Sequence, residues 1–221
     1  MAHQNDKRFQ STSILATSVP MLISRGLEPE SDNFSQQDSI NMHPEWNLHY
    51  ERWVIEDGQP DLAVGEIFKW FAIAFWTESK LVKVDERTKS AVPIEDYKYR
   101  VVAEVRYVSE KACIIDFGLT ATASVDLLPD ECREGDHVRG EIYLNLPLCT
   151  DVVPEELFKI LAHKWQVNRI SADLTPYVAS SENPRFLSRD DSRIRYQEVT
   201  ATRSVRANSY VLHCSEAVEL P

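Results

Sequence analysis

The chain has 221 residues, of which 43% are hydrophobic, and a formal net charge of -11. This length and hydrophobic content are enough for a full core in one main domain. The negative charge argues against a surface built throughout to follow a phosphate backbone. The four cysteines lie far apart without a CxxC pair, which argues against a zinc ribbon or a thioredoxin-type site and favours reduced thiols in a cytosolic protein.

Residues 1–43 are predicted to form a flexible N-terminal arm with an acidic linker. Lys7 and Arg8 precede an apolar run over 14–23, but polar residues interrupt that run and no small-x-small cleavage site follows, so we reject a signal peptide. Residues 28–41 are rich in Ser, Asn, Gln and acids, which is typical of a linker. No stretch approaches the roughly 20 apolar residues of a membrane span, so we expect no membrane partner.

The densest run of large apolar side chains covers residues 63–76 and is predicted to be the central strand. Its large side chains alternate onto both faces, so both faces would be buried. A helix is the competing interpretation, because Ile67, Phe71 and Phe75 also fit a period of 3.6. Aromatic side chains and Gly65 favour the strand.

Shorter elements flank this run. Residues 48–55 are predicted as a first core strand, and the turn chemistry of residues 57–61 predicts a hairpin that leads into the central strand. Residues 80–84 are predicted as a short strand before a charged loop over 85–90. An edge strand of this kind leaves homo-oligomer formation open.

A strict alternation over residues 97–108 predicts a half-exposed antiparallel strand, with Tyr99, Val101 and Val105 on the buried face. Residues 112–118 and 122–127 are predicted as the next two strands. A second alternating strand follows, with one face inward and the other outward. The inward residues are Val138, Gly140, Ile142, Leu144 and Leu146, and the outward residues are His137, Arg139, Glu141, Tyr143 and Asn145.

These segments, over about residues 97–146, resemble the core of an OB-fold barrel of the S1-like type. The resemblance rests on the strand order and on the step Gly135-Asp-His-Val138. It implies a barrel whose second and third strands carry aromatic residues for stacking bases. This chain has Ala112, Cys113 and Thr122 near the matching region. The resemblance therefore implies the fold more strongly than the nucleic-acid function.

The C-terminal part is predicted to contain one helix, near 154–164, that caps the barrel or sheet. Pro154 suits the first helical position, and Leu157, Ile160 and Leu161 form an apolar stripe. Residues 180–191 are predicted as a loop, and residues 194–205 and 209–218 as a closing hairpin. The predicted fold is therefore mainly β: an antiparallel, partly closed barrel or strongly bent sheet with one capping helix, in a single domain over 44–221.

Charge is distributed unevenly along the chain. Residues 28–66 carry ten acidic residues against Arg52 alone, whereas residues 185–206 carry six arginines against three acids. Such faces steer charged partners, although they can also be solvated or pair with each other. The candidate partner-binding residues are Arg193, Arg195, Arg203 and Tyr196 on the predicted hairpin, and Glu51, Glu56 and Asp57 in the acidic segment.

Three functional hypotheses follow. The first is a non-enzymatic cytosolic binding protein, immunity-like or adaptor-like, that recognises another protein through charged β-sheet faces. The second is an OB-type module that binds single-stranded nucleic acid through the Arg-rich C-terminal hairpin. The third is an enzyme that acts through Asp116, His137 and Glu141. The sequence has no glycine-rich phosphate loop, GxSxG or HExxH, and we expect no cofactor and no metal.

Overall fold

The computed structural model describes residues 45–70, 72–147, 157, 161–179 and 187–217. These residues belong to a unit that spans Asn41–Pro221. The predicted N-terminal arm over 1–43 lies outside the described residues. The fold is mainly β, as the alternating patterns predict, with 54% of the described residues in strands and 10% in helices.

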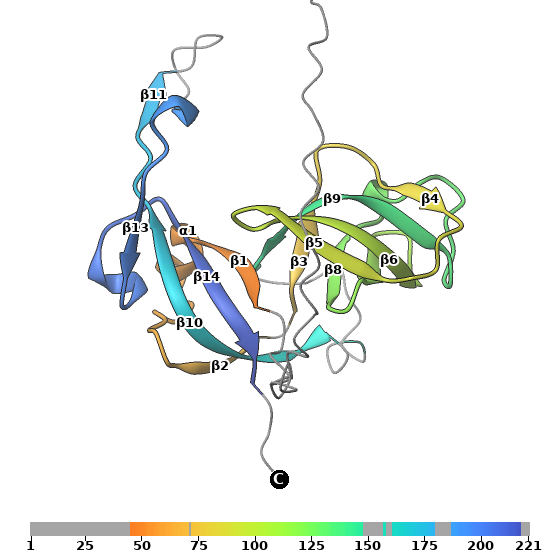
Figure 1. Ribbon diagram of the computed structural model, residues 1–221, viewed down its shortest axis with the longest axis horizontal. Coiled ribbons are helices and arrows are strands. Elements are labelled where there is room, and N and C mark those ends of the chain that lie inside the picture. The colour runs from red at the N-terminus through yellow and green to blue at the C-terminus, as the bar shows by residue number, and fades with distance from the viewer. Residues whose placement is uncertain (1–44, 71, 148–156, 158–160, 180–186, 218–221) are drawn as a thin grey trace, which may run out of the picture. The chain divides into compact units, whose positions relative to one another are not determined.

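A closed five-stranded barrel forms one of the two parts of the structure (Figure 1). Its strands are β3 (Ala74–Trp76), β6 (Lys98–Val108), β7 (Ala112–Asp116), β8 (Thr120–Ser124) and β9 (His137–Asn145). The ring runs β6-β7-β8-β3-β9 and closes by pairing of β9 with β6. All pairs are antiparallel except β3 with β8, where Ala74 lies opposite Thr122. The barrel is therefore mixed, although most of its pairings are antiparallel.

Short elements extend the barrel. Strand β4 (Val82–Val84) pairs with β9, β5 (Ser90–Glu95) pairs with β6, and a 3-10 turn, η1 (Val125–Leu127), follows β8. The predicted strand over 80–84 thus includes β4, whereas β5 was not predicted. Pro93 and exposed Val92 and Ile94 make β5 a poor match to the alternating pattern of a half-buried strand.

A second group of strands continues the same sheet. It comprises β1 (Trp46–Glu51), β2 (Ile67–Trp70), β10 (His163–Asp173), β13 (Tyr196–Val199) and β14 (Ser209–Glu216). Strand β1 joins the two parts, because it pairs with β14 along its whole length and with β9 at His49 and Asn145. The remaining elements are α1 (Arg52–Glu56), η3 (Asp191–Arg193), η4 (Thr202–Ser204) and a separate two-stranded sheet of β11 (Tyr177–Ala179) and β12 (Leu187–Arg189).

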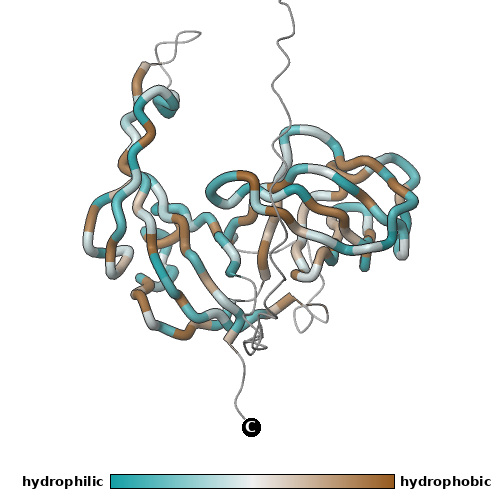
Figure 2. Tube along the Cα trace, viewed as in Figure 1, coloured by the Kyte–Doolittle hydropathy of each residue, from teal (hydrophilic) through white to brown (hydrophobic). Residues whose placement is uncertain are grey.

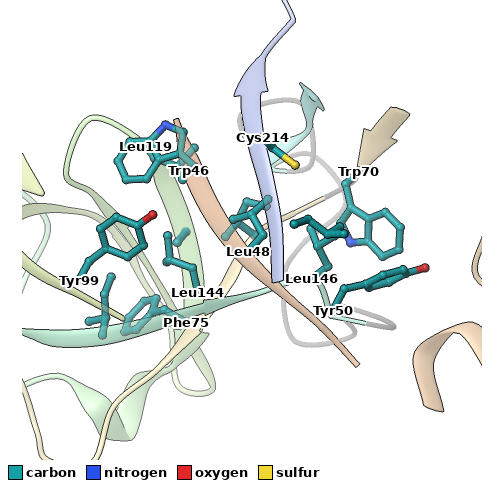
Figure 3. Close-up of a cluster of buried hydrophobic side chains, with 14 of the residues drawn as sticks. Trp46, Leu48, Tyr50, Trp70, Phe75, Tyr99, Leu119, Leu144, Leu146 and Cys214 are labelled. Atoms are coloured by element: carbon teal, nitrogen blue, oxygen red, sulfur yellow. The ribbon is translucent and has the colours of Figure 1, made fainter. Parts of the chain in front are cut away.

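One main hydrophobic core runs through both parts of the sheet, and β1 crosses it (Figure 3). The ring of Trp46 lies 5.4 Å from that of Tyr99 and 5.7 Å from that of Phe117 in the barrel. Tyr50, further along β1, meets Trp70 of β2 at 5.7 Å. The two parts therefore share buried side chains as well as backbone pairing.

The predicted central strand over 63–76 is divided into β2 and β3, so the prediction of one continuous strand is wrong. Strand β2 pairs with β10, whereas β3 pairs with β8 and β9. Ala72 and Ile73, between them, are adjacent in sequence and both fully buried, which fits the predicted two-sided burial. The predicted burial does not hold along the whole run, because Ile67 is 61% and Trp76 43% exposed. Phe71 lies outside the described residues.

The predicted first strand over 48–55 and the hairpin after it also need correction. Strand β1 ends at Glu51, and the next residues form α1, with Arg52 and Glu56 ion-paired at 2.6 Å. The turn over 57–61 does not join β1 to β2, because β1 pairs with β14 and β9. Its residues follow the helix instead, and the Asp57 N–H donates to the Trp53 carbonyl.

The predicted strand over 97–108 is confirmed as β6, and Tyr99, Val101, Ala103 and Val105 are buried along one face. The prediction over 112–118 contains β7. The strand predicted over 122–127 is shifted, because β8 runs from Thr120 to Ser124 and residues 125–127 form η1. Cys113 and Cys214 lie fully buried in β7 and β14, as small apolar side chains do.

Most of the predicted helix near 154–164 lies outside the described residues, but its end is wrong, because His163 and Lys164 begin β10. The predicted closing hairpin is also wrong. Strand β10 lies between β13 and β14 and pairs with both. Its buried residues switch phase at an irregularity between Val167 and Arg169, which hides the alternation in the sequence. Residues 180–186 of the predicted loop lie outside the described residues, and residues 187–189 form β12.

Gly140 on β9 lies against Leu81, and we expect Gly140→Ala to destabilise the barrel by about 1–2 kcal/mol. A Cβ atom there would approach Leu81 Cδ2 to 2.5 Å, and Leu81 is only 2% exposed. Chemical denaturation measures the loss. The Leu81→Ala background should remove most of the added cost of Gly140→Ala, and an equal cost in both backgrounds would contradict the packing argument.

Candidate functional site

A cavity of about 490 Å³ lies where the turn between β5 and β6 faces β1, the end of β10 and the β11–β12 hairpin. Aromatic rings and carboxylates dominate its lining. The aromatic residues are His49, Tyr97, Tyr143, Tyr177 and Tyr196. The acidic residues are Glu51, Glu95, Asp96, Asp173 and Asp191, against the cations Lys98 and Arg189. We call this cavity the tyrosine cavity.

Four rings form a continuous row that ends at the tyrosine cavity. Trp76 and Tyr143 are cross-strand partners on β3 and β9, and their rings stack 4.0 Å apart at 6°. The Tyr143 and Tyr97 rings lie 5.9 Å apart, and His49 stacks on Tyr97 at 4.3 Å and 12°. Lys98 Nζ lies 5.0 Å from the centre of the Tyr143 ring. Strand register therefore sets the Trp76–Tyr143 pair, and the turn between β5 and β6 places Tyr97 between Tyr143 and His49.

Asp96 sits in the tight turn between β5 and β6, with a φ of 36°. Its carboxylate accepts a hydrogen bond of 2.7 Å from the Tyr196 hydroxyl, and its carbonyl accepts one of 2.6 Å from Asn47 Nδ2. The barrel turn is thus bonded to both β1 and β13. Asp tolerates the left-handed conformation better than most residues, which suits it to this position.

Arg189 of β12 holds the opposite wall. Its Nε donates to Asp173 at 3.1 Å, one terminal nitrogen to Asp191 at 2.7 Å, and the other to the Tyr196 hydroxyl at 3.2 Å. The Asp173 carboxylate also accepts the Thr175 N–H at 2.8 Å. Because Asp173 is buried, this network neutralises its charge and ties the β11–β12 hairpin to the end of β10.

Burial sets the protonation of the rings around the cavity. It raises the pKa of Tyr97 to about 12, and it raises the pKa of Tyr196 together with the hydrogen bond to Asp96. Burial also lowers the pKa of His49. At neutral pH Tyr97 and Tyr196 are therefore uncharged and His49 is predominantly neutral.

A second cavity, of about 580 Å³, adjoins the first, because Tyr177 and Asn208 line both. Its other residues include Arg52, Trp53, Glu56 and Arg206. We call the two cavities together the groove. Large apolar side chains are exposed along it: Trp53 is 49%, Tyr177 48% and Ile194 54% exposed. Val178 and Leu187 are exposed on the adjoining hairpin, where Figure 2 shows hydrophobic positions in brown.

The predicted partner-binding residues are divided among several places. Glu51 and Tyr196 line the tyrosine cavity, and Glu56 lines the second one. The arginines do not share a hairpin: Arg193 ends η3 and bonds Asp190 at 2.5 Å, Arg195 precedes β13, and Arg203 lies in η4. Asp57 lies in the exposed turn after α1.

The acidic and basic segments meet in part, as the alternative reading of the charge pattern allowed. Glu56, Arg203 and Arg52 line one further cavity. The guanidinium of Arg52 bonds Glu56 and lowers the pKa of that carboxyl, with a smaller effect from Arg206. Part of the unevenly distributed charge is therefore compensated by interactions within the molecule.

The structure does not bring Asp116, His137 and Glu141 together as a catalytic group. Asp116 pairs with Lys89 at 2.8 Å, and Glu141 pairs with Lys98 and Arg100. His137 was predicted to face outward but is only 8% exposed, and it lies opposite Glu104 on β6. Among the described residues, no group of three or more His, Cys, Asp or Glu side chains is arranged to hold a metal ion.

A small hydrophobic cluster covers part of β7. Ala112 and Ile114 are buried against Ala72 and Leu161, and Leu157 packs beside them. His163 Nε2 lies 3.0 Å from the Thr120 hydroxyl on β8. The chain itself therefore occupies a surface of β7 and β8 that the OB resemblance assigns to base stacking.

No protein-family model matches this sequence, and neither curated proteins nor solved structures give a match. The structure itself defines the class: a mainly β protein built on a closed five-stranded mixed barrel. In the part of the chain that the structure describes, no helix has the length and apolar character needed to cross a membrane.

Acid should destabilise the fold through His49. Because its pKa is lowered on folding, the unfolded chain takes up the proton first, and stability falls as the pH drops below the ordinary histidine pKa of about 6.5. His49→Phe keeps a ring against Tyr97 and removes the titration. Urea unfolding at pH 7.5 and 5.5 should show a smaller loss in this variant than in the wild type, and equal losses would contradict the expectation.

Proposed function

We propose that this chain is a non-enzymatic binding protein that recognises a protein partner through the groove. The observation that carries the proposal is the exposure of Trp53, Tyr177 and Ile194 along two adjoining cavities. Tryptophan, tyrosine and arginine dominate the binding energy of protein interfaces when they surround a hollow that a partner can fill. Arg52 and Arg206, which line the second cavity, add to this composition.

Recognition would depend on the groove, and not on the charged sheet faces alone. The groove combines β1, α1, the barrel turn and the β11–β12 hairpin, so its specificity comes from several elements held by hydrogen bonds. A cytosolic location remains part of the proposal. It is supported by the free thiols of Cys113, Cys132 and Cys214 among the described residues.

We also propose that the barrel is a circularly permuted OB fold, in which the last strand of the usual order comes first along the chain. Strands β6, β7 and β8 would be the first three, β9 the fourth and β3 the fifth, which accounts for the parallel pairing of β3 with β8. Nucleic-acid binding remains the alternative function. The stacked Trp76 and Tyr143 rings beside Lys98 favour it, whereas the covering of β7 by Leu157 and Leu161 opposes it.

Site-specific crosslinking tests the proposal. A photoreactive phenylalanine at position 177 or 53, in cells of the native source, should give discrete protein adducts. The same group at Val82, which is 63% exposed on β4 outside the groove, serves as the matched control and should not. Nuclease-sensitive adducts at position 177, or the same adducts at all three positions, would reject protein recognition through the groove.

The groove variants Trp53→Ala and Tyr177→Ala should each weaken binding of the captured partner by about 30-fold, as truncation of an interface hot spot does. Val82→Ala should leave the affinity unchanged. Gel-shift titration with single-stranded DNA and RNA at two salt concentrations tests the alternative: salt-sensitive binding that Trp76→Ala abolishes would favour nucleic acid.

A further inference from the structure

The tyrosine cavity has more carboxylates than its own cations can neutralise. Arg189 is bonded to Asp173 and Asp191, and Lys98 is paired with Glu141 at 3.1 Å, outside the lining. Among the ion pairs of the described residues, none includes Glu95 or Asp96. Glu51 lies 3.9 Å from His49 Nδ1, and its carboxylate also accepts a hydrogen bond from Trp53 Nε1. Three lining carboxylates are therefore left without a full positive charge.

Aromatic rings surround these carboxylates. Tyr97 presents a ring stacked on His49, Tyr196 is bonded to Asp96, and Tyr177 is half exposed at the entrance. Rings attract a cation through their electron-rich faces, and carboxylates attract it by charge. The same lining repels a phosphate. A volume of about 490 Å³ is large enough for a long side chain with its aliphatic stem.

We infer that the tyrosine cavity binds an arginine side chain presented by the partner protein. This assignment rests on the proposed function, and it specifies what the partner must carry. The guanidinium would lie against the carboxylates of Glu95 and Asp96, where its planar fork can donate two hydrogen bonds and stack on a ring. Its aliphatic stem would contact Tyr177 and Ile194 at the entrance.

A titration of the full chain with the capped tripeptide acetyl-Gly-Arg-Gly-amide tests the inference. Binding is monitored by the NMR chemical shifts of the backbone amides. We expect millimolar binding that shifts Asp96, Tyr97 and Asn208. Binding should weaken about fivefold or more between 50 and 500 mM salt. The citrulline tripeptide, which has nearly the same shape without the charge, should cause no comparable shifts.

The double variant Glu95→Gln/Asp96→Asn should reduce the arginine affinity at least fivefold, because it removes charge and keeps the acceptor for Tyr196. The variant Glu110→Gln/Glu134→Gln is the matched control, since it removes two exposed carboxylates outside the cavity. It should bind as the wild type does. Equal effects of the two double variants would overturn the inference, because the attraction would then come from net charge alone.

The remaining outcomes separate this inference from the proposed function. Absence of cavity shifts, or equal shifts with citrulline, overturns the arginine assignment even if crosslinking at position 177 captures a protein. Arginine binding without any protein adduct supports the assignment of the cavity and rejects protein recognition. An eight-nucleotide oligo(dT) that displaces the tripeptide from the same residues would assign the cavity to nucleic acid and overturn the inference.

Discussion

Replacing Trp46 by alanine is expected to lower the free energy of unfolding by about 3–5 kcal/mol. Trp46 is 6% exposed and contacts Tyr99 and Phe117, so its loss would leave a void where β1 meets the barrel. Equilibrium denaturation in urea measures the change. The effect should exceed that of any single substitution on the groove surface.

Trp53→Ala provides the matched control for Trp46→Ala, because the same side chain is 49% exposed on α1. It should cost less than about 1 kcal/mol. Similar losses in the two variants would mean that β1 does not join the two parts through one core. A biphasic transition in Trp46→Ala would instead indicate that the parts unfold separately once that contact is weakened.

Arg189→Ala is expected to be the second most destabilising change, at about 2 kcal/mol. It leaves the Asp173 carboxylate, which is 8% exposed, without its counter-charge, and it removes a donor to Tyr196. The expected loss of stability is smaller than for a fully buried ion pair, because the Arg189 side chain is 30% exposed. The variant should also loosen the β11–β12 hairpin, which faster amide hydrogen exchange at residues 187–189 would report.

Arg193→Ala is the control for the loss of an arginine. The Arg193 side chain pairs with Asp190 but is 61% exposed. We expect a change below about 0.5 kcal/mol. Adding Asp173→Asn to Arg189→Ala should recover part of the lost stability, because the amide carries no charge. Failure of this rescue would show that the buried charge is not the cause.

Strands with a regular alternation were predictable from the sequence, as β6 and β9 demonstrate. Their inward residues are apolar and mostly fully buried, and antiparallel pairing lets the opposite face stay polar. Elements whose pattern is interrupted were missed. Strand β10 is the main example, because the irregularity between Val167 and Arg169 moves the buried positions by one residue.

Strand partners were less predictable than strands. The hairpin expected near the C-terminus assumed that neighbours in sequence pair, whereas β10 separates β13 from β14. Likewise, the OB resemblance stopped at residue 146 and overlooked β3, which closes the ring from an earlier part of the chain. Periodicity reports which face of a strand is buried, and it carries no information about distant partners.

Only part of the candidate site could be found from the sequence. Glu51 and Tyr196 were singled out by charge and aromatic composition, and both line the tyrosine cavity. Arg189 was counted in the basic segment but not singled out, and Asp173 gave no signal, because a buried ion pair between a strand end and a hairpin depends on tertiary contacts. Tyr143 was assigned to the outward face of its strand, which gave no sign that its ring lies 5.9 Å from that of Tyr97.

The position of β3 in the ring also bears on how this protein emerges from the ribosome. Residues 74–76 are translated well before 120–124 and 137–145, the two segments between which they finally lie. Until those segments are synthesised, the nascent chain exposes Phe75 and both backbone edges of β3. The barrel therefore closes late in translation, and a chaperone that shields this stretch would limit aggregation in the meantime.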